Sequence, residues 1–441
     1  MLLDWTTWHN GWTAPGSTAD AIFRGLLALV VLLAAFEPIK ELDTSVSWRA
    51  DTLGARLGTR CVTPVARIAL SALLVVAAAL FTGDLLSVVA LVVIAAVFTL
   101  LAVVYLSQEF AGYVTEEDDG TKKFKVHHHL HLTGMAVLAA SAAGVAAVVA
   151  GHADEPRTVT LWIAQGVWAA IGAHYVVSAV SKVRKRGLRW PDRRLFPFYI
   201  TLFAHYRRGD GKLVEEKGLP WTLVRNPDWG VVLLWTALLM EFSTPLVLLG
   251  YGPRLVLCAC LVIFHLSTLW LLAVDFRENA MLAALAALPL PSLGGSLGEL
   301  HLDPLPWAVF AVCVVLSFAF DDRVFPFSNL PMFAAAYKPI SVITLRSLDG
   351  TVRYATPTYA HCPTTGLSRE YAAAHSESDG LEAFLNRVRE RTARQDPPLP
   401  SDAALWAEVI DVTPAGHVVT SPSLVAHLRP SDHSDAGPHA Q

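Results

Sequence analysis

A phenol, a hydroxyl and an amine recur at helical spacing near the end of an apolar segment. They are Tyr175, Ser178 and Lys182 in the stretch AHYVVSAVSKVRKRGLRW, which begins like a membrane helix and ends as a basic loop. Desolvation and neighbouring cations favour the neutral form of an amine, and a neutral amine is a competent general base. Lysines at helix ends also extend to the lipid headgroups as anchors. Lys182 is therefore interpreted either as a base or as an anchor.

Three further ionisable residues fall well inside apolar segments. His174 lies in AIGAHYVV, Glu241 in LLMEFSTPL and His265 in LVIFHLSTL. An ionisable group at mid-bilayer costs about 2.5–3.5 kcal/mol on insertion scales, so each one needs a partner or a function. Either each side chain makes an interhelical hydrogen bond, or the three line one polar pocket formed by consecutive spans. Glu37 and Glu109 lie at segment ends, where the membrane boundary explains them.

A cluster of histidines occurs in KVHHHLHL, at His127, His128, His129 and His131. Histidines three apart on a helix can share one metal-ligand face, and the cluster resembles part of the histidine boxes of membrane desaturases. Those boxes require more clustered histidines on other cytoplasmic segments, where this sequence offers only the isolated His205. We therefore expect no metal, and interpret the cluster as the polar start of a helix.

The composition is that of a membrane protein. Of 441 residues, 54% are hydrophobic and 16% are charged, whereas soluble domains average about 25% charged residues. The net charge of −4 is too small to indicate nucleic acid as a partner. The five cysteines form no paired pattern and no ligand spacing, so no disulfide framework is expected. The segment MLLDWTTWHNGW lacks a basic region, so no cleavable signal peptide is expected.

Apolar windows predict an all-α polytopic membrane domain over residues 1–335, with about nine transmembrane or re-entrant helices. A helix needs roughly 20 apolar residues to cross the hydrocarbon core. Two of the windows are weaker, Ala280–Leu290 and Leu305–Phe320, and the first is short enough to be re-entrant. The seven firm windows are Ala21–Ile39, Val65–Phe81, Leu85–Leu106, Leu132–Ala150, Val159–Val180, Trp229–Leu249 and Leu255–Val274.

Basic residues are distributed asymmetrically between the loops. They concentrate in alternate loops, above all in the segment from Lys182 to Asp228, whereas the other loops hold only Arg157 and Arg254. Cytoplasmic loops carry the excess of lysine and arginine. This predicts a multi-pass protein of the cell membrane with its N-terminus outside and its C-terminus in the cytoplasm.

The C-terminal part of the chain changes character and predicts a small soluble α+β domain over residues 336–428. ISVITLRSLDGTVRYATP alternates around Asp349-Gly350, a strong hairpin signal. DGLEAFLNRVRERTAR has helical spacing of apolar residues, and ALWAEVIDVTPAGHVV is typical of a second hairpin. Residues 429–441 are polar and without period, which predicts a disordered tail.

Several segments resemble one family of membrane proteins in their order and spacing. AHYVVSAVSKVRKRGLRW resembles the part of vitamin K-dependent γ-glutamyl carboxylases and related HTTM proteins where a tyrosine precedes a lysine and a tryptophan follows, here Trp190. LMEFSTPLVLL, VIFHLSTLWLL, AMLAALAALPLP and VFPFSNLPMFA continue the resemblance. It covers residues 160–335.

The resemblance implies a quinol-dependent carboxylase or quinol-oxidising enzyme with Lys182 as the base. Reduced vitamin K or menaquinol would be deprotonated and oxidised, and the alkoxide formed would remove a γ-proton from a glutamate-containing peptide or protein, which then captures CO2. In this interpretation Lys182 and His265 are catalytic. The quinol pocket would comprise Tyr175, His174, Glu241, Trp190 and Ser178.

A second function stays open. The chain is then a non-catalytic multi-pass membrane protein that acts as a maturation, immunity or interaction partner. In that case membrane lipid is its environment, Lys182 is an anchor, and the polar residues of the spans make structural hydrogen bonds.

Overall fold

The computed structural model describes the greater part of the chain. The predicted disordered tail, residues 429–441, lies outside the described residues. The described ranges are 18–41, 63–106, 112–272, 276–288, 304–320 and 339–428, with the single residues 57 and 326 and with gaps at 84–86, 117–121, 127–128, 361–363, 376–379 and 394–397.

The chain separates into two compact units. Unit 1 comprises residues 1–190, 235–270 and 274–335, and unit 2 comprises residues 191–234, 271–273 and 336–441. The division at residue 335 lies where the sequence changes from membrane-like to alternating. Unit 2 also takes in the basic segment that starts at Pro191, so this segment is more than a connecting loop.

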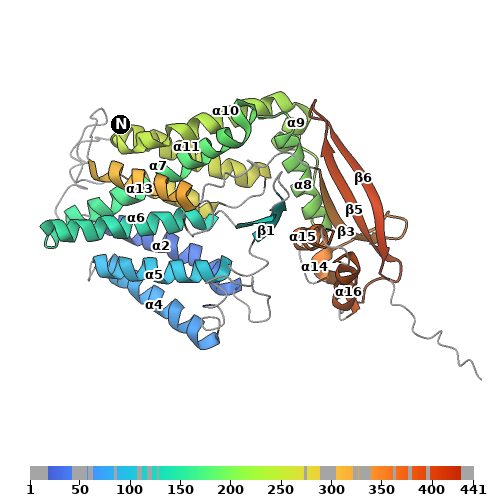
Figure 1. Cartoon of the computed structure of the whole chain (residues 1–441), viewed down its shortest axis with the longest axis horizontal. Helices are drawn as coiled ribbons and strands as arrows, with labels where there is room; N and C mark the ends of the chain where they lie inside the picture. The colour runs from blue at the N-terminus through green and yellow to red at the C-terminus, as the bar shows by residue number, and fades with distance from the viewer. Residues whose placement is uncertain are drawn as a thin grey trace, which may run out of the picture. The chain divides into compact units, whose positions relative to one another are not determined.

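Seven helices are long and apolar enough to cross a membrane, and they lie in the seven windows predicted most firmly. Each of them is labelled in Figure 1. The shorter α12 (Arg277–Ala286) and α13 (Pro304–Phe320) correspond to the two weaker windows. The seven are α2 (Thr18–Glu41), α4 (Pro64–Thr82), α5 (Ser87–Leu106), α6 (His129–Ala147), α7 (Pro156–Arg186), α10 (Pro227–Ser243) and α11 (Tyr251–Leu272).

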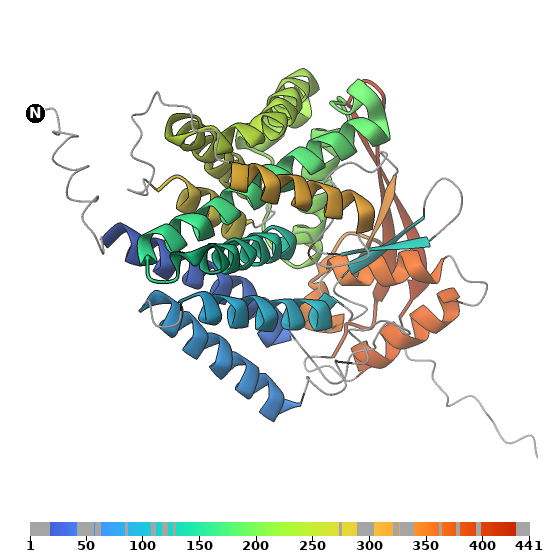
Figure 2. The ribbon, with the colours of Figure 1, turned by 60° about the vertical axis from the view of Figure 1, so that its left-hand side comes forward.

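Helix α7 is the central element of unit 1. Its apolar window is 78% buried, more than that of any other candidate span, and it contacts α6, α13 and the short helix η4 (Thr244–Leu248). Figure 2 shows α6 and α13 alongside it. Small residues permit this packing, because a Cβ atom at Gly166 would lie 2.5 Å from the backbone oxygen of Ala139 in α6. The residues of α7 are therefore held at fixed positions.

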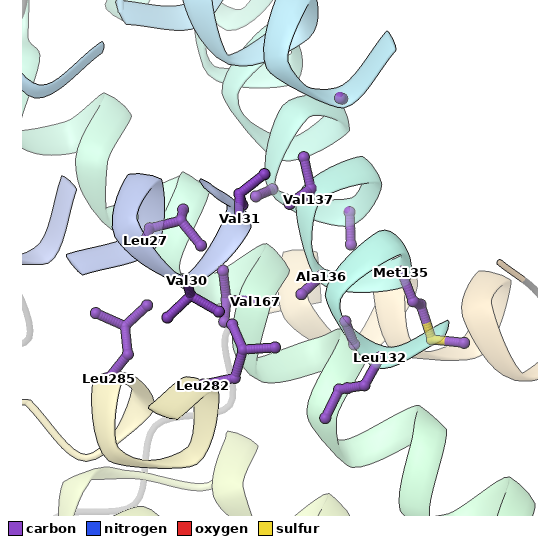
Figure 3. Packing of buried hydrophobic residues seen from close by; sticks show 14 of the residues in the cluster. Leu27, Val30, Val31, Leu132, Met135, Ala136, Val137, Val167, Leu282 and Leu285 are labelled. Atoms are coloured by element: carbon purple, nitrogen blue, oxygen red, sulfur yellow. The ribbon is translucent and has the colours of Figure 1, made fainter. Parts of the chain in front are cut away.

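Apolar side chains from four helices form the core on one side of α7 (Figure 3). Helix α12 is 10 residues long, too short to span a bilayer alone, yet Leu282 and Leu285 bury their side chains in this core. Labelled in the core are Leu27, Val30 and Val31 of α2, Leu132, Met135, Ala136 and Val137 of α6, Val167 of α7, and Leu282 and Leu285 of α12.

A two-stranded hairpin that the sequence did not predict lies between α5 and α6. Strand β1 (Gly112–Glu116) pairs antiparallel with β2 (Lys122–Val126). The signal was hidden because the charged residues around it indicated a loop, and a hairpin of five-residue strands has too few positions to establish a period.

Unit 2 is built on a four-stranded antiparallel sheet of order β4-β3-β5-β6. Strand β3 (Ile340–Ser347) pairs with β4 (Arg353–Tyr354), and Gly350 takes a φ of 74° in the turn. The second hairpin, β5 (Ala403–Val412) and β6 (Val418–His427), is also confirmed. The helices are α14 (Thr356–Ala360), α15 (Thr364–Ala374) and α16 (Gly380–Ala393), preceded in the basic segment by α8 (Leu195–Gly209) and α9 (Gly218–Arg225).

Helix α8 joins this sheet through both apolar and charged contacts. Phe198 and Leu202 pack against the sheet residues Val342, Ile410 and Val412. Glu408 of β5 forms ion pairs with Arg346 and with Arg353, the latter at 3.0 Å, and its Oε2 lies 3.8 Å from Nε2 of His205 in α8. The isolated histidine of the basic segment is therefore part of a buried charge cluster.

Substituting Gly166 by alanine is expected to force α6 and α7 apart. The new methyl group meets backbone atoms, which cannot rotate away, so the free energy of unfolding should fall by about 1–3 kcal/mol. Thermal unfolding in detergent measures the change. Gly172→Ala on the same helix is the matched control, because its Cβ would have no neighbour nearer than 3.5 Å. Equal effects of the two substitutions would contradict the prediction.

The stability of unit 2 is expected to fall on the acid side of neutrality because of His205. Burial is the main cause that lowers the pKa of His205 below its ordinary value of 6.5, so the unfolded chain binds a proton first as the pH falls. Stability should be constant above pH 6.5 and decrease below it. His205→Gln should flatten this decrease in melting curves between pH 8 and pH 5.5. The exposed His417→Gln is the control. If His205→Gln lost as much stability below pH 6.5 as the wild type does, the role given to His205 would be contradicted.

Candidate functional site

Lys182 is buried and paired. Its side chain and that of Glu241 are each 4% exposed, and Nζ donates to both carboxylate oxygens, with Nζ–Oε2 at 2.6 Å. The pair joins the last turns of α7 to α10. Lys182 therefore does not extend to the surface of the bundle as an anchoring lysine would.

Further side chains fix this pair in place. The Ser178 hydroxyl, one turn before Lys182, is hydrogen-bonded to Glu241. The Trp190 ring, 1% exposed, lies 4.8 Å from Nζ measured to the ring centroid, which is a cation–π distance. The Thr244 hydroxyl lies 2.7 Å from the backbone oxygen of Glu241 and 3.1 Å from that of Gly172. This contact ties the end of α10 to α7 and sets the height of Glu241.

A second polar pair lies two turns earlier on α7. The Tyr175 hydroxyl and Nε2 of His265 in α11 are hydrogen-bonded, and both side chains are buried. The imidazole of His265 also contacts aromatic rings, with the Phe276 centroid 5.6 Å away. Its other nitrogen, Nδ1, is buried without a hydrogen-bond partner. One ring nitrogen of His265 is thus hydrogen-bonded, and the other has no partner among the described residues.

His174 lies beside the second pair. Its ring packs edge-on against Tyr175 with centroids 5.3 Å apart, and its Nδ1 is also buried without a hydrogen-bond partner. His131 of α6, His265 and Lys182 are near enough to interact with it electrostatically. His174 is therefore a third polar group on this part of α7.

The predicted site residues thus fall into two groups along one helix. Lys182, Glu241, Ser178 and Trp190 form the first group, and Tyr175, His265 and His174 form the second. Positions 175 and 182 are seven residues apart, which is about 10 Å along a helix. The arrangement offers a buried amine and carboxylate that can share one proton, and two histidine nitrogens that can bind a polar ligand.

The histidine cluster is described only in part. His131 is buried, and its Nδ1 lies 3.0 Å from the backbone oxygen of Pro326. His127 and His128 lie outside the described residues. Within the described part of the chain, no group of three or more His, Cys, Asp or Glu side chains has metal-site geometry.

Comparison with known proteins gives no match to this chain, whether to family models, to curated proteins or to solved structures. Membership of the vitamin K-dependent carboxylase and HTTM family therefore stays a prediction.

Sequence reasoning missed one residue that positions the site, and it missed the surroundings of another. Thr244 holds Glu241 through backbone oxygens, and His131 lies near His174. A threonine followed by proline at the end of an apolar window was a usable signal for Thr244, because such a hydroxyl bonds to a carbonyl of the preceding turn. His131 was noted only as a member of the histidine cluster, and no signal in the sequence placed it near His174.

Tyr175→Phe is expected to destabilise the protein by removing the only hydrogen bond of the His265 ring. A buried imidazole without a partner costs about 1–3 kcal/mol. The double variant Tyr175→Phe with His265→Phe should recover much of this loss, because both polar groups are then gone. Melting temperatures of the two single variants and the double variant form the test, and strictly additive losses would contradict the pairing.

Proposed function

We propose that this chain is a multi-pass membrane enzyme that oxidises a quinol, with Lys182 as the base. The observation that carries the proposal is the buried Lys182–Glu241 pair on the central helix. A second polar pair, Tyr175 with His265, lies two turns away on the same helix, in a bundle of helices apolar enough to cross a membrane. Such a position suits a substrate that dissolves in lipid and whose chemistry requires exclusion of water.

The residues present fit a quinol. Nδ1 of His174 and Nδ1 of His265 are buried polar atoms without partners, and both can bond to a hydroxyl or carbonyl oxygen. A bound quinol supplies an acidic hydroxyl and the electrons that reduce oxygen. Tyr175 keeps Nε2 of His265 engaged and so orients the imidazole.

Lys182 takes up the hydroxyl proton at Nζ. It must first be neutral, and Glu241 provides for this by holding the proton that the two groups share. Burial favours the neutral amine and neutral acid over separated charges, since neither charge then lacks solvation. After the transfer Glu241 still holds its proton, and the added proton makes Nζ cationic. The Glu241 oxygen 2.6 Å from Nζ and the Trp190 ring then stabilise this charge.

One specific feature supports a second candidate function. Nζ of Lys182 donates to both oxygens of Glu241, so the pair is a complete bridge between α7 and α10. A non-catalytic membrane protein that acts as a maturation, immunity or interaction partner would use such a bridge for stability alone. In either function we place the chain in the cell membrane, with the N-terminus outside and the C-terminus in the cytoplasm, following the charge asymmetry of the loops.

Quinol epoxidation in lipid nanodiscs tests the enzyme proposal. The protein receives menaquinol or reduced vitamin K with oxygen and bicarbonate, and the epoxide is detected by mass spectrometry. The wild type should form epoxide, and Lys182→Ala should lose about 10²–10⁴-fold in rate, the usual contribution of a general base. The exposed Lys185→Ala on the same helix is the matched control and should keep the wild-type rate.

A charge exchange separates the two functions. Lys182→Glu combined with Glu241→Lys retains the ion pair but moves the amine to α10. If the pair only joins the helices, the exchange restores the melting temperature that either single change lowers, and the wild type forms no epoxide. If Lys182 is the base, the exchange restores stability without restoring epoxide. A wild type without epoxide under all of these conditions contradicts the enzyme proposal.

A further inference from the structure

Arg254 is a buried cation at the start of α11. It is 1% exposed, and its guanidinium carbon lies 3.6 Å from the centroid of the Trp168 ring in α7 and 5.4 Å from that of Tyr251. Its Nε and Nη2 atoms are buried without hydrogen-bond partners. Among the residues that the structure describes, no carboxylate forms an ion pair with it.

This environment lacks a negative charge. A guanidinium stays protonated in proteins, and a buried charge requires a partner that neutralises it. The faces of the two aromatic rings supply part of the compensation. The rings offer no hydrogen-bond acceptor in the plane of the guanidinium, and its N–H groups point in that plane.

Within the described part of the chain, several donors at this place have no acceptor. The Trp168 ring stacks against the guanidinium, and its Nε1 atom is likewise buried without a hydrogen-bond partner. Nε and Nη2 of Arg254 and Nε1 of Trp168 are therefore three donor nitrogens, with four N–H groups between them, that have no acceptor among the described residues. The N-terminal end of α11 adds positive potential, since Arg254 is the fourth residue of that helix. A water molecule would satisfy one donor but would leave the charge unbalanced.

We propose that Arg254 and Trp168 form a binding site for an oxyanion of the phosphate or carboxylate type. The planar fork of a guanidinium matches these groups, which accept two parallel hydrogen bonds. The anion is either the headgroup of an anionic lipid or a soluble ion. Trp168 precedes Lys182 by 14 residues, about 21 Å along α7, so this site is separate from the proposed quinol site and does not depend on it.

Melting temperatures in dodecyl maltoside, an uncharged detergent without phosphate, test the proposal. Inorganic phosphate, acetate or phosphatidylglycerol is titrated in, with sodium chloride at equal ionic strength as the reference. The wild type should show a saturable rise of about 2 °C with at least one probe. A rise with phosphatidylglycerol alone identifies a lipid headgroup, and a rise with phosphate or acetate identifies a soluble ion.

Arg254→Met removes the charge and should abolish the rise. Arg157→Met is the matched control: it removes an arginine from the loops predicted to lie on the same side of the membrane, and it should respond as the wild type does. Trp168→Phe keeps an aromatic ring under Arg254 and removes one donor, so it should raise the probe concentration at half-effect about tenfold.

The wild-type titration tests the proposed anion site even if Arg254→Met does not fold. No saturable rise in any of the three titrations overturns the proposal, as does an equal rise in a folded Arg254→Met. An unchanged half-effect concentration in Trp168→Phe would overturn the part assigned to Trp168.

Discussion

The burial of one lysine charge constrains the rest of the bundle. Lys182 and Glu241 are each nearly inaccessible, and removing one member of such a pair leaves the other charge unpaired at a cost of about 3–5 kcal/mol. The two helices must therefore meet at a fixed height, which the Thr244 contacts to both backbones secure. Close packing of α7 against α6 at Gly166 holds the helix from its other side. The position of Nζ thus depends on packing far from the charge itself.

Polar and apolar contacts divide the surface of α7 between them. Val167 belongs to the apolar core with α2, α6 and α12, whereas Trp168, Tyr175 and Lys182 make their polar contacts with α10 and α11. These polar contacts recur every seven residues, at Trp168, Tyr175 and Lys182, and a seven-residue period keeps side chains close to one face. Each level has its own partner, respectively Arg254, His265 and Glu241. One face of α7 thus carries three polar contacts at intervals of seven residues, and Val167 packs in the apolar core.

The sequence predicted the parts that depend on composition along the chain and missed those that depend on neighbours. Hydropathy located the seven long helices, and turn chemistry at Asp349-Gly350 located the first hairpin of unit 2. Lys182, Glu241 and His265 were identifiable because ionisable residues in apolar windows need a reason. The pairing of Lys182 with Glu241 and of His265 with Tyr175 could not be predicted. The spacing of apolar residues indicates which residues are buried, but it does not indicate which residues they contact. Arg254 was likewise assigned to a loop, because its burial against Trp168 depends on a contact between two helices.

The pattern of satisfied and unsatisfied atoms argues for a ligand-binding bundle over a merely structural one. In a structural network, nearly all buried polar atoms find partners. Here Lys182, Glu241 and Tyr175 have theirs, whereas Nδ1 of His174 and Nδ1 of His265 do not. An unsatisfied buried group costs about 1–3 kcal/mol, so one such group on α7 and one on α11 together carry a cost that a bound polar molecule would remove. The helices that carry them are fixed by the Lys182–Glu241 bridge, and a site held rigid before binding loses little entropy on binding. In the proposed function, the Lys182–Glu241 bridge therefore holds the helices in place, and Nδ1 of His174 and Nδ1 of His265 bind the polar ligand.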